Sequence, residues 1–313
     1  MLAYIQRRLL MLLPVLIGIS IVVFLVMHIA PGDPAEILAG PTASASDIAA
    51  LRAKLGLDDP VWVQYWRFVS GILRGDLGES VQSGESVTEM LGTRFPNTLA
   101  LSVAAMIVAS LIGLSAGIVS AVKKGSVFDS LSMIGALLGI SLPSFWLGLM
   151  FMLVFAVRLR WLPVAGYNGE WWTLLGVKQL VLPAVTLGIG TSALIARITR
   201  SSILEVMKED YIRTARAKGL SQFITIGKHV LRNAMVPVIT VMGLNFGGLL
   251  GGTVVTESVF AINGVGRMMV RAITSRDFPV VQGAVLLVAT TFVLINLLVD
   301  LTYALLDPRI RYD

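Results

Sequence analysis

The stretch YIRTARAKGLS, residues 211–221, places three basic side chains among small residues in a chain that otherwise carries little charge. It lies between two runs without a formal charge, 179–196 and 233–256. Similar runs cover 9–32, 95–122, 130–157 and 278–299. The shortest of the six runs has 18 residues, and about 20 helical residues cross the core of a bilayer. We therefore expect an all-α integral membrane protein with six transmembrane helices.

The overall composition supports a bilayer as the solvent. Of 313 residues, 56% are hydrophobic and 14% are charged, and the mean hydropathy is +0.82. A soluble domain usually has about 25% charged residues. There is no cysteine, which excludes disulfides, thiolate metal sites and cysteine nucleophiles.

The distribution of lysine and arginine predicts the orientation. With the N-terminus inside, 14 of the 25 basic residues lie on the inner side, most of them in short loops. The outer segments hold 11 basic residues together with 12 acidic ones, whereas the inner loops hold 6 acidic ones. Because basic residues concentrate in short cytoplasmic loops, we expect both termini to be cytoplasmic.

These runs predict the organisation of the chain. We expect an N-terminal transmembrane helix at 1–30, an outer segment at 31–93, a membrane core at 94–306 and a cytoplasmic tail at 307–313. The core has expected spans at about 95–122, 130–157, 179–199, 233–256 and 280–305, with a cytoplasmic loop at 200–232.

Within this loop, good helix formers run from Ile203 to Lys218. Glu209 and Arg213 stand four residues apart in the favourable order for an ion pair on a helix. Gly219 followed by Leu220 is typical of a left-handed helix end, and Ser221 is suited to cap the next helix. We therefore expect two helices joined by a sharp turn.

Three interpretations of this helix pair are open. It is a solvated positive-inside loop, a DNA-binding helix-turn-helix, or a docking element for a cytoplasmic protein. Anchoring at both ends within 36 residues makes access to a DNA duplex implausible, so we expect no nucleic-acid partner. Small residues such as Thr214 and Ala217 allow close approach, and Arg213, Arg216 and Lys218 supply charge for an acidic groove. These features favour docking.

The other motifs do not predict a catalytic site. GLSAG at 113–117 matches a nucleophile pattern, but neither His28 nor His229 lies at the depth of Ser115, so an intramembrane serine protease is disfavoured. Gly113 and Gly117 are typical of helix packing instead. The phosphate-binding motif G-x-x-x-x-G-K-[ST] is absent, and we expect no catalytic, cofactor or metal site in this chain. Asp300, near the inner end of the last span, is a candidate intramembrane polar site.

YIRTARAKGLS, continued by His229 and LRNAMVPV, resembles the EAA loop of binding-protein-dependent ABC importer permeases. The glutamate and the later proline of the general pattern are replaced by Arg213 and Arg232, as in the peptide, glutathione and nickel branch. MHIAPGDP (27–34), LGLDDPVWVQYW (55–66), GDLGES (75–80), RFPNTLAL (94–101), NGVGRMMVRAI (263–273), RDFPVVQG (276–283) and LLDPRIR (305–311) are similar to the same family.

The resemblance implies a type I ABC importer fold, with a five-span core and an added N-terminal span, in the bacterial inner membrane. It implies a transport subunit without enzymatic activity, translocating short peptides, with nickel chelates or glutathione as alternatives. The implied partners are a sibling permease forming a heterodimer, two ATPase subunits that bind ATP and Mg, an extracytoplasmic solute-binding protein and membrane lipid. The implied ATPase-coupling residues are Glu209, Asp210, Tyr211, Arg213, Thr214, Ala215, Arg216, Ala217, Lys218, Gly219 and Leu220.

The largest outer segments, 31–97 and 257–281, are expected to form part of the surface that meets the binding protein. They hold the aromatic residues Trp62, Tyr65, Trp66 and Phe260, a residue type enriched in interfaces. The alternative is that these aromatics line the membrane–water boundary.

Overall fold

Helices make up nearly all the regular structure in the computed structural model, which describes residues 2–29, 34–40, 43–167 and 169–306. An isolated bridge joins Glu79 to Ser86. The helices are α1 (Leu2–Ile29), α2 (Pro34–Ala39), α3 (Ala45–Leu55), α4 (Val61–Leu73), α5 (Val87–Val122), α6 (Val127–Ser141), α7 (Ser144–Phe151), α8 (Leu174–Val206), α9 (Asp210–Ala217), α10 (Gln222–Ile224), α11 (Leu231–Gly252), α12 (Val254–Val259), α13 (Val265–Thr274) and α14 (Phe278–Leu306). Two π-helical turns, Met152–Arg158 and Thr225–Val230, extend α7 and connect α10 to α11.

Four of these helices, α5, α8, the α10–α11 segment and α14, are long and apolar enough to cross a membrane. A fifth candidate is the pair formed by α6 and α7 with its π-helical turn. The described side chains of α1 contribute a shorter apolar stretch, Leu10–Val26. The all-helical, membrane-spanning class is therefore confirmed, while the exact number of six spans stays a prediction.

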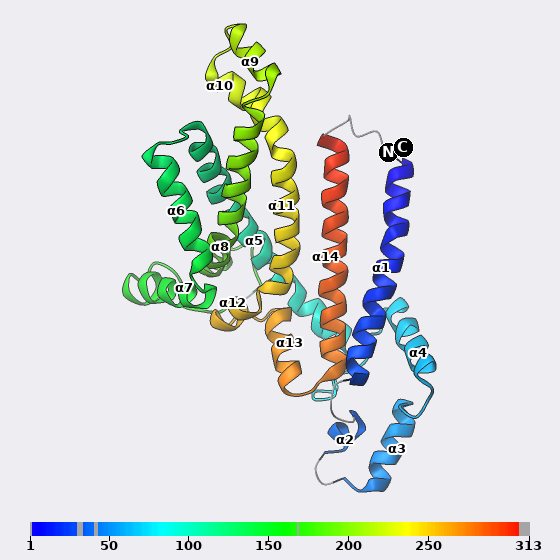
Figure 1. The fold of residues 1–313 in the computed structure, drawn as a ribbon. Coiled ribbons are helices and arrows are strands. Elements are labelled where there is room, and N and C mark those ends of the chain that lie inside the picture. The colour runs from blue at the N-terminus through cyan, green and yellow to red at the C-terminus, as the bar shows by residue number, and fades with distance from the viewer. Residues whose placement is uncertain (1, 30–33, 41–42, 168, 307–313) are drawn as a thin grey trace. The chain divides into compact units, whose positions relative to one another are not determined.

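The expected span at 130–157 is bent in the structure. α6 and the α7 segment meet at an angle of 103°, visible in Figure 1. The break lies at Leu142 and Pro143, where Leu142 adopts an extended backbone conformation. Proline lacks an N–H group and disfavours helical geometry in the preceding residue. This segment is therefore a broken span or a re-entrant loop.

The chain forms two compact units. The first unit comprises Met1–Pro96 and Asn263–Val293, and the second comprises Asn97–Ile262 and Leu294–Asp313. Two of the three boundaries fall inside α5 and α14, so each of these helices contributes to both units, and the third lies between α12 and α13.

In the first unit, α4 packs on α1. The Phe24 ring lies 5.4 Å from the Tyr65 ring in an edge-on arrangement, and the hydroxyls of Ser20 and Tyr65 are 2.9 Å apart. A second cluster joins α13 to the first turns of α5 and α14 through Val87, Leu91, Val265, Met268, Ala272, Val280 and Ala284. These buried apolar side chains fix the position of α13.

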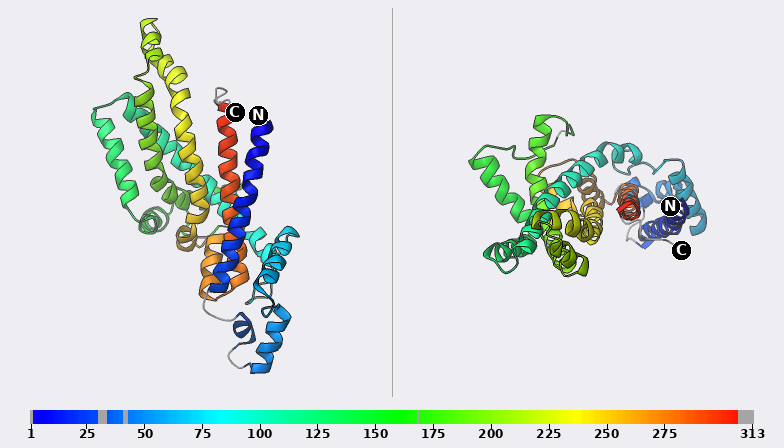
Figure 2. Two further views of the ribbon diagram at one scale, coloured as in Figure 1. Left: turned by 45° about the vertical axis from the view of Figure 1, so that its right-hand side comes forward. Right: turned by 90° about the horizontal axis from the view of Figure 1, so that it is seen from above.

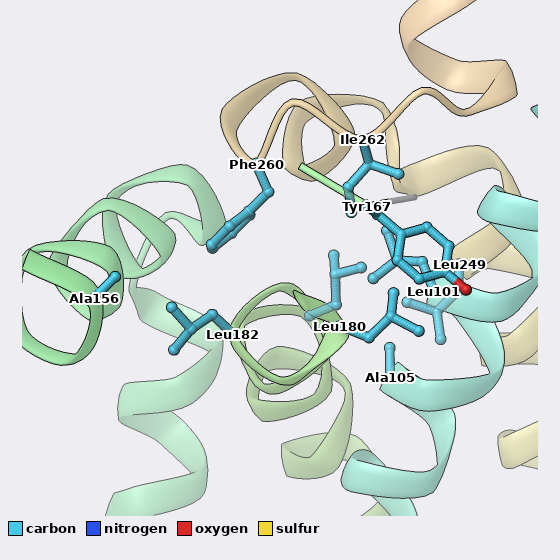
Figure 3. Close-up of a cluster of buried hydrophobic side chains, with 10 residues drawn as sticks. Leu101, Ala105, Ala156, Tyr167, Leu180, Leu182, Leu249, Phe260 and Ile262 are labelled. Carbon is cyan, nitrogen blue, oxygen red and sulfur yellow. The ribbon is translucent and has the colours of Figure 1, made fainter. Parts of the chain in front are cut away.

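In the second unit, α8 packs against α6, α7, α11 and α12, and it buries the largest share of its apolar span among the candidate spans. The two views of Figure 2 show α8 beside α6 and α11. Leu180 and Leu182 of α8 meet Leu101 of α5 and Phe260 in one buried cluster (Figure 3). Tyr167 joins this cluster, and burial raises the pKa of its phenol.

Two glycines of α5 lie against α8, as the packing interpretation of GLSAG predicts. A Cβ built on Gly113 would lie 2.8 Å from Ile195, and one built on Gly117 would lie 2.6 Å from Thr199. Ser115 lies on the exposed side of α5. The motif therefore serves close helix packing.

Phe260 is the one expected outer aromatic that the structure hides. Its side chain is 3% exposed, within the cluster of Figure 3. Trp62 and Trp66 are exposed, whereas Tyr65 is half-buried against α1. Phe260 is therefore a core residue of the second unit and is not available as an interface aromatic.

Candidate functional site

The expected continuous helix from Ile203 to Lys218 is divided into two. α8 ends at Val206, and α9 begins at Asp210 after a short turn. Glu209 stands before α9 with an extended backbone and makes no side-chain capping bond. An acidic residue in a first helical turn favours a new start because it complements the helix dipole. The chain direction therefore changes here, and α9 and α10 lie beyond the ends of α8 and α11 (Figure 1).

The expected Glu209–Arg213 pair is replaced by another, because Glu209 lies outside the helix. The Nη1 atom of Arg213 lies 3.5 Å from Oδ1 of Asp210, and both side chains are largely exposed. Exposed pairs of this kind contribute about 0–1 kcal/mol, so Arg213 remains available to a partner.

The end of α9 follows the predicted pattern. Gly219 has a φ of +81°, its N–H donates to the carbonyl of Arg216 at 2.9 Å, and the Leu220 N–H donates to the carbonyl of Ala215 at 3.3 Å. This pair of bonds is the Schellman motif. Ser221 then caps α10 by accepting from the Ile224 N–H at 3.4 Å. The prediction of two helices joined at Gly219 is confirmed.

One side of α9 is held by the second unit. Ile212 is fully buried and Ala215 is buried. Ile212 lies in a cluster with Ile203 of α8 and Val230, which leads into α11. The amide of Asn233 in α11 donates to the Tyr211 hydroxyl at 2.9 Å. The helix is therefore attached to both α8 and α11.

The other side of α9 is exposed. The exposed members of the expected coupling set are Glu209, Asp210, Tyr211, Arg213, Thr214, Arg216, Ala217, Lys218, Gly219 and Leu220. Of that set, Ala215 is the member that the structure buries. We call these exposed residues, together with Phe223, the α9 surface. It combines basic side chains, small residues and apolar ones.

Three residues of this region were missed by sequence reasoning. Phe223 has a side chain that is 88% exposed, although an aromatic residue usually buries much of its area. Ile212 and Asn233 hold α9 in place, and the apolar spacing of Ile212 and Ala215 was a usable signal. Nothing in the sequence pairs Asn233 with Tyr211, because the contact joins residues 22 apart.

A partly buried ion pair lies at the start of α6. Arg200 of α8 donates from Nε to Oδ1 of Asp129 at 2.8 Å and from Nη2 to Oδ2 at 2.8 Å. The Gly125 N–H donates to Oδ2 at 3.0 Å, and the Ser120 hydroxyl donates to Oδ1. The carboxylate therefore ties the turn between α5 and α6 to the helix that leads to α9.

The remaining candidate, Asp300, lies in α14, and its side chain is outside the described residues. Among the residues that the structure describes, no group of three or more His, Asp or Glu side chains is arranged to hold a metal ion.

Comparison with known proteins identifies the family. Residues 111–312 match the binding-protein-dependent transport system inner membrane component, and residues 1–102 match the N-terminal region of such membrane components. The chain belongs to this family of transport permeases. The resemblance seen in the sequence is thereby confirmed, and the chain is a transport subunit.

Relatives of this permease align over its whole length. The dipeptide transport system permease protein DppB of Alkalihalophilus pseudofirmus is 47% identical, and the glutathione transport system permease protein GsiC of Escherichia coli K12 is 46% identical, each over 100% of both chains. An inward-facing structure of the MetNI methionine ABC transporter matches with a TM-score of 0.57 at 20% identity, over 70% of this chain and 96% of that one. The last likeness shows the type I importer fold.

Proposed function

We propose that this chain is the permease subunit of an ATP-driven importer of short peptides. The proposal is supported by the permease family match and by full-length relatives named for dipeptide and glutathione transport. Glutathione is itself a short peptide, so both names describe one substrate class. A nickel chelate is the remaining alternative from the sequence.

The proposed assembly contains a sibling permease, two ATPase subunits and an extracytoplasmic solute-binding protein. The ATPases bind ATP and Mg, and this chain holds no cofactor of its own. Both termini and the α9 surface face the cytoplasm, as the lysine and arginine distribution predicts. The protein lies in the bacterial inner membrane.

The coupling role is supported by the fact that one side of α9 is buried and the other is exposed. Its exposed side offers Arg213, Arg216 and Lys218 beside small residues, while Ile212 on the opposite side is fully buried. A partner that binds the exposed side and moves α9 therefore also moves α8 and α11. We propose that closure of the ATPases is transmitted in this way to the transport pathway.

Gly219 and Arg216 test the coupling role. No atom lies within 4 Å of a Cβ built on Gly219, but its φ is +81°. Gly219→Ala therefore adds backbone strain of about 1 kcal/mol and should transport nearly normally. Gly219→Trp should insert in the membrane yet lose transport, because the large ring blocks the approach of the ATPase.

Arg216→Glu should weaken co-purification of the ATPases, because the charge reversal places two negative groups in contact in an acidic groove. Lys124→Glu is the matched control: it reverses a charge on the exposed turn between α5 and α6, outside the α9 surface. Normal transport and ATPase recovery in both Gly219→Trp and Arg216→Glu would show that the loop has no docking role.

Substrate class is tested with the reconstituted importer and its binding protein. We expect uptake of a labelled dipeptide or of glutathione into proteoliposomes, dependent on ATP. Uptake of nickel chelate alone would replace the peptide proposal while leaving the permease role intact.

A further inference from the structure

A polar cavity of about 140 Å³ lies in the first unit, between residues 80–83, the start of α5 and α13 with the turn that follows it. Its floor contains the buried residues Ser80, Met268, Ala272, Asp277 and Val280. Gln82, Ser83 and Arg271 are exposed and form its mouth. The cavity therefore opens to the surface from a packed base.

Three arginines line this cavity. Arg267 and Arg271 stand one helical turn apart on α13, and Arg94 comes from α5. Arg267 and Arg94 are half-buried, while Arg271 is exposed. The lining thus concentrates three guanidinium groups in a small volume.

Asp277 is the one acidic residue among the described residues of the lining. It is 4% exposed, its Oδ2 accepts from the Ser80 hydroxyl at 2.5 Å, and its Oδ1 accepts from the Val81 N–H at 3.1 Å. Both oxygens of this carboxylate are thus engaged by neutral donors of the 80–83 turn. Among the described residues, the lining thus combines three arginines with one carboxylate that is already held by neutral donors.

The walls are held before any ligand arrives. Met268, Ala272 and Val280 belong to the apolar cluster shared by α5, α13 and α14. The Asp277 N–H donates to the Ala272 carbonyl at 2.8 Å, which fixes the end of α13 (orange in Figure 1). A site that is already ordered loses less entropy when it binds a partner.

The chemistry and size of the cavity select its ligand. Guanidinium groups recognise carboxylates through paired hydrogen bonds. A volume of 140 Å³ is below the roughly 300–1,000 Å³ of sites for whole small molecules. The cavity therefore suits a single functional group such as a carboxylate.

We infer that this cavity receives a carboxylate side chain of the solute-binding protein when that protein docks. The inference rests on the proposed function, because it needs that partner and an extracytoplasmic position for residues 76–86 and 263–277. Charge complementarity is the basis for the choice. Gln82 and Ser83 around the opening provide hydrogen-bonding groups for the backbone that carries the carboxylate.

The test measures the affinity of the dipeptide-loaded binding protein for the assembled importer in nanodiscs. Arg271→Gln should weaken binding about tenfold, as expected for an arginine at the centre of an interface. Arg276→Gln is the matched control, because Arg276 is exposed on the same turn but does not line the cavity. It should stay within about twofold of the wild type.

A second variant supplies a competing carboxylate from this chain itself. Ser83→Asp places a carboxylate at the mouth and should also weaken binding, without removing any arginine. Yield of the assembled complex and its melting temperature verify that both variants fold. In addition, Arg271→Glu combined with an arginine in place of the docking carboxylate should recover binding, which identifies the partner residue.

Wild-type affinity in both Arg271→Gln and Ser83→Asp would overturn the inference, and so would an equal loss in Arg276→Gln. A phospholipid phosphate is a competing ligand for the same arginines. If the variants alter ATPase activity without binding protein, and do so in phosphatidylglycerol but not in phosphatidylcholine nanodiscs, the cavity is a lipid site and the inference is wrong.

ATPase stimulation distinguishes failure of the proposed function from failure of the docking inference. A wild-type complex whose ATPase activity the binding protein does not stimulate would contradict the importer proposal and the docking inference together. Normal stimulation of the wild type with unaffected cavity variants would contradict the docking inference alone.

Discussion

Arg200 and Asp129 form a two-bonded ion pair that joins α8 to the start of α6, with both nitrogen–oxygen distances at 2.8 Å. The carboxylate side chain is 9% exposed and the guanidinium side chain is 28% exposed. Two further donors, Ser120 and Gly125, also bond to this carboxylate, so each of its oxygens accepts two hydrogen bonds. Its position indicates that it keeps the helix leading to α9 in register with its neighbours.

Removing one partner of this pair should destabilise the protein. Arg200→Gln leaves a buried negative charge with neutral donors, and we expect a loss of about 2–3 kcal/mol in unfolding free energy, below the ~3–5 kcal/mol for fully buried pairs because Arg200 is partly exposed. Thermal unfolding of the purified complex in nanodiscs measures the effect. The double variant Arg200→Gln/Asp129→Asn should recover at least part of the loss.

Arg197→Gln provides the control for that pair. Arg197 is exposed on α8 and lies one turn earlier, so its substitution should change the unfolding free energy by about 0.5 kcal/mol or less. A melting temperature of Arg200→Gln that equals the control would mean that the ion pair contributes nothing measurable.

Phe223 should matter for partner binding and not for folding. Its side chain is 88% exposed, so Phe223→Ala should leave the melting temperature of the isolated permease pair unchanged. Loss of a buried aromatic anchor at an interface costs about 2 kcal/mol or more, and recovery of the ATPases on co-purification should fall accordingly. Phe223→Leu, which keeps an apolar side chain, should retain most of the recovery. Full recovery with Phe223→Ala would exclude this residue from the docking surface.

Glu257 should be a structural residue of the second unit. It is fully buried, and its Oε1 accepts from the hydroxyls of Thr98 at 2.7 Å and Thr253 at 2.9 Å. Glu257→Leu would leave two buried donors without that acceptor, at about 1–3 kcal/mol each, so we expect poor yield and a lower melting temperature. Glu257→Gln keeps an accepting oxygen and should be milder. Equal stability of the two variants would contradict a hydrogen-bonding role.

The orientation can be tested with single cysteines, since the chain has none. Ser46→Cys should react with an impermeant thiol reagent in spheroplasts. Lys124→Cys, on the exposed turn between α5 and α6, and Gln222→Cys, exposed at the start of α10, should react only after the membrane is permeabilised. Labelling of Lys124→Cys from outside would reverse the proposed topology.

The break between α6 and α7 could not be predicted from the sequence. Pro143 marks the bend between α6 and α7, yet Pro14, Pro96, Pro183 and Pro237 lie inside unbroken helices. A proline removes one backbone hydrogen bond and strains one helical turn. Whether the helix continues past the proline depends on whether packing against neighbouring helices compensates for that cost. The residue type alone could therefore not distinguish the break from the four tolerated prolines.

The sequence by itself determined the helical membrane class, the family and the turn at Gly219, because each depends on local properties. Apolar runs need only their length, and a left-handed helix end needs only a glycine at the right position. Tertiary structure alone decided which carboxylate Arg200 meets and that Asp277 bonds to Ser80. Those partners are 71 and 197 residues apart in the chain. These contacts depend on how the helices pack, and the local sequence around one residue does not specify its distant partner.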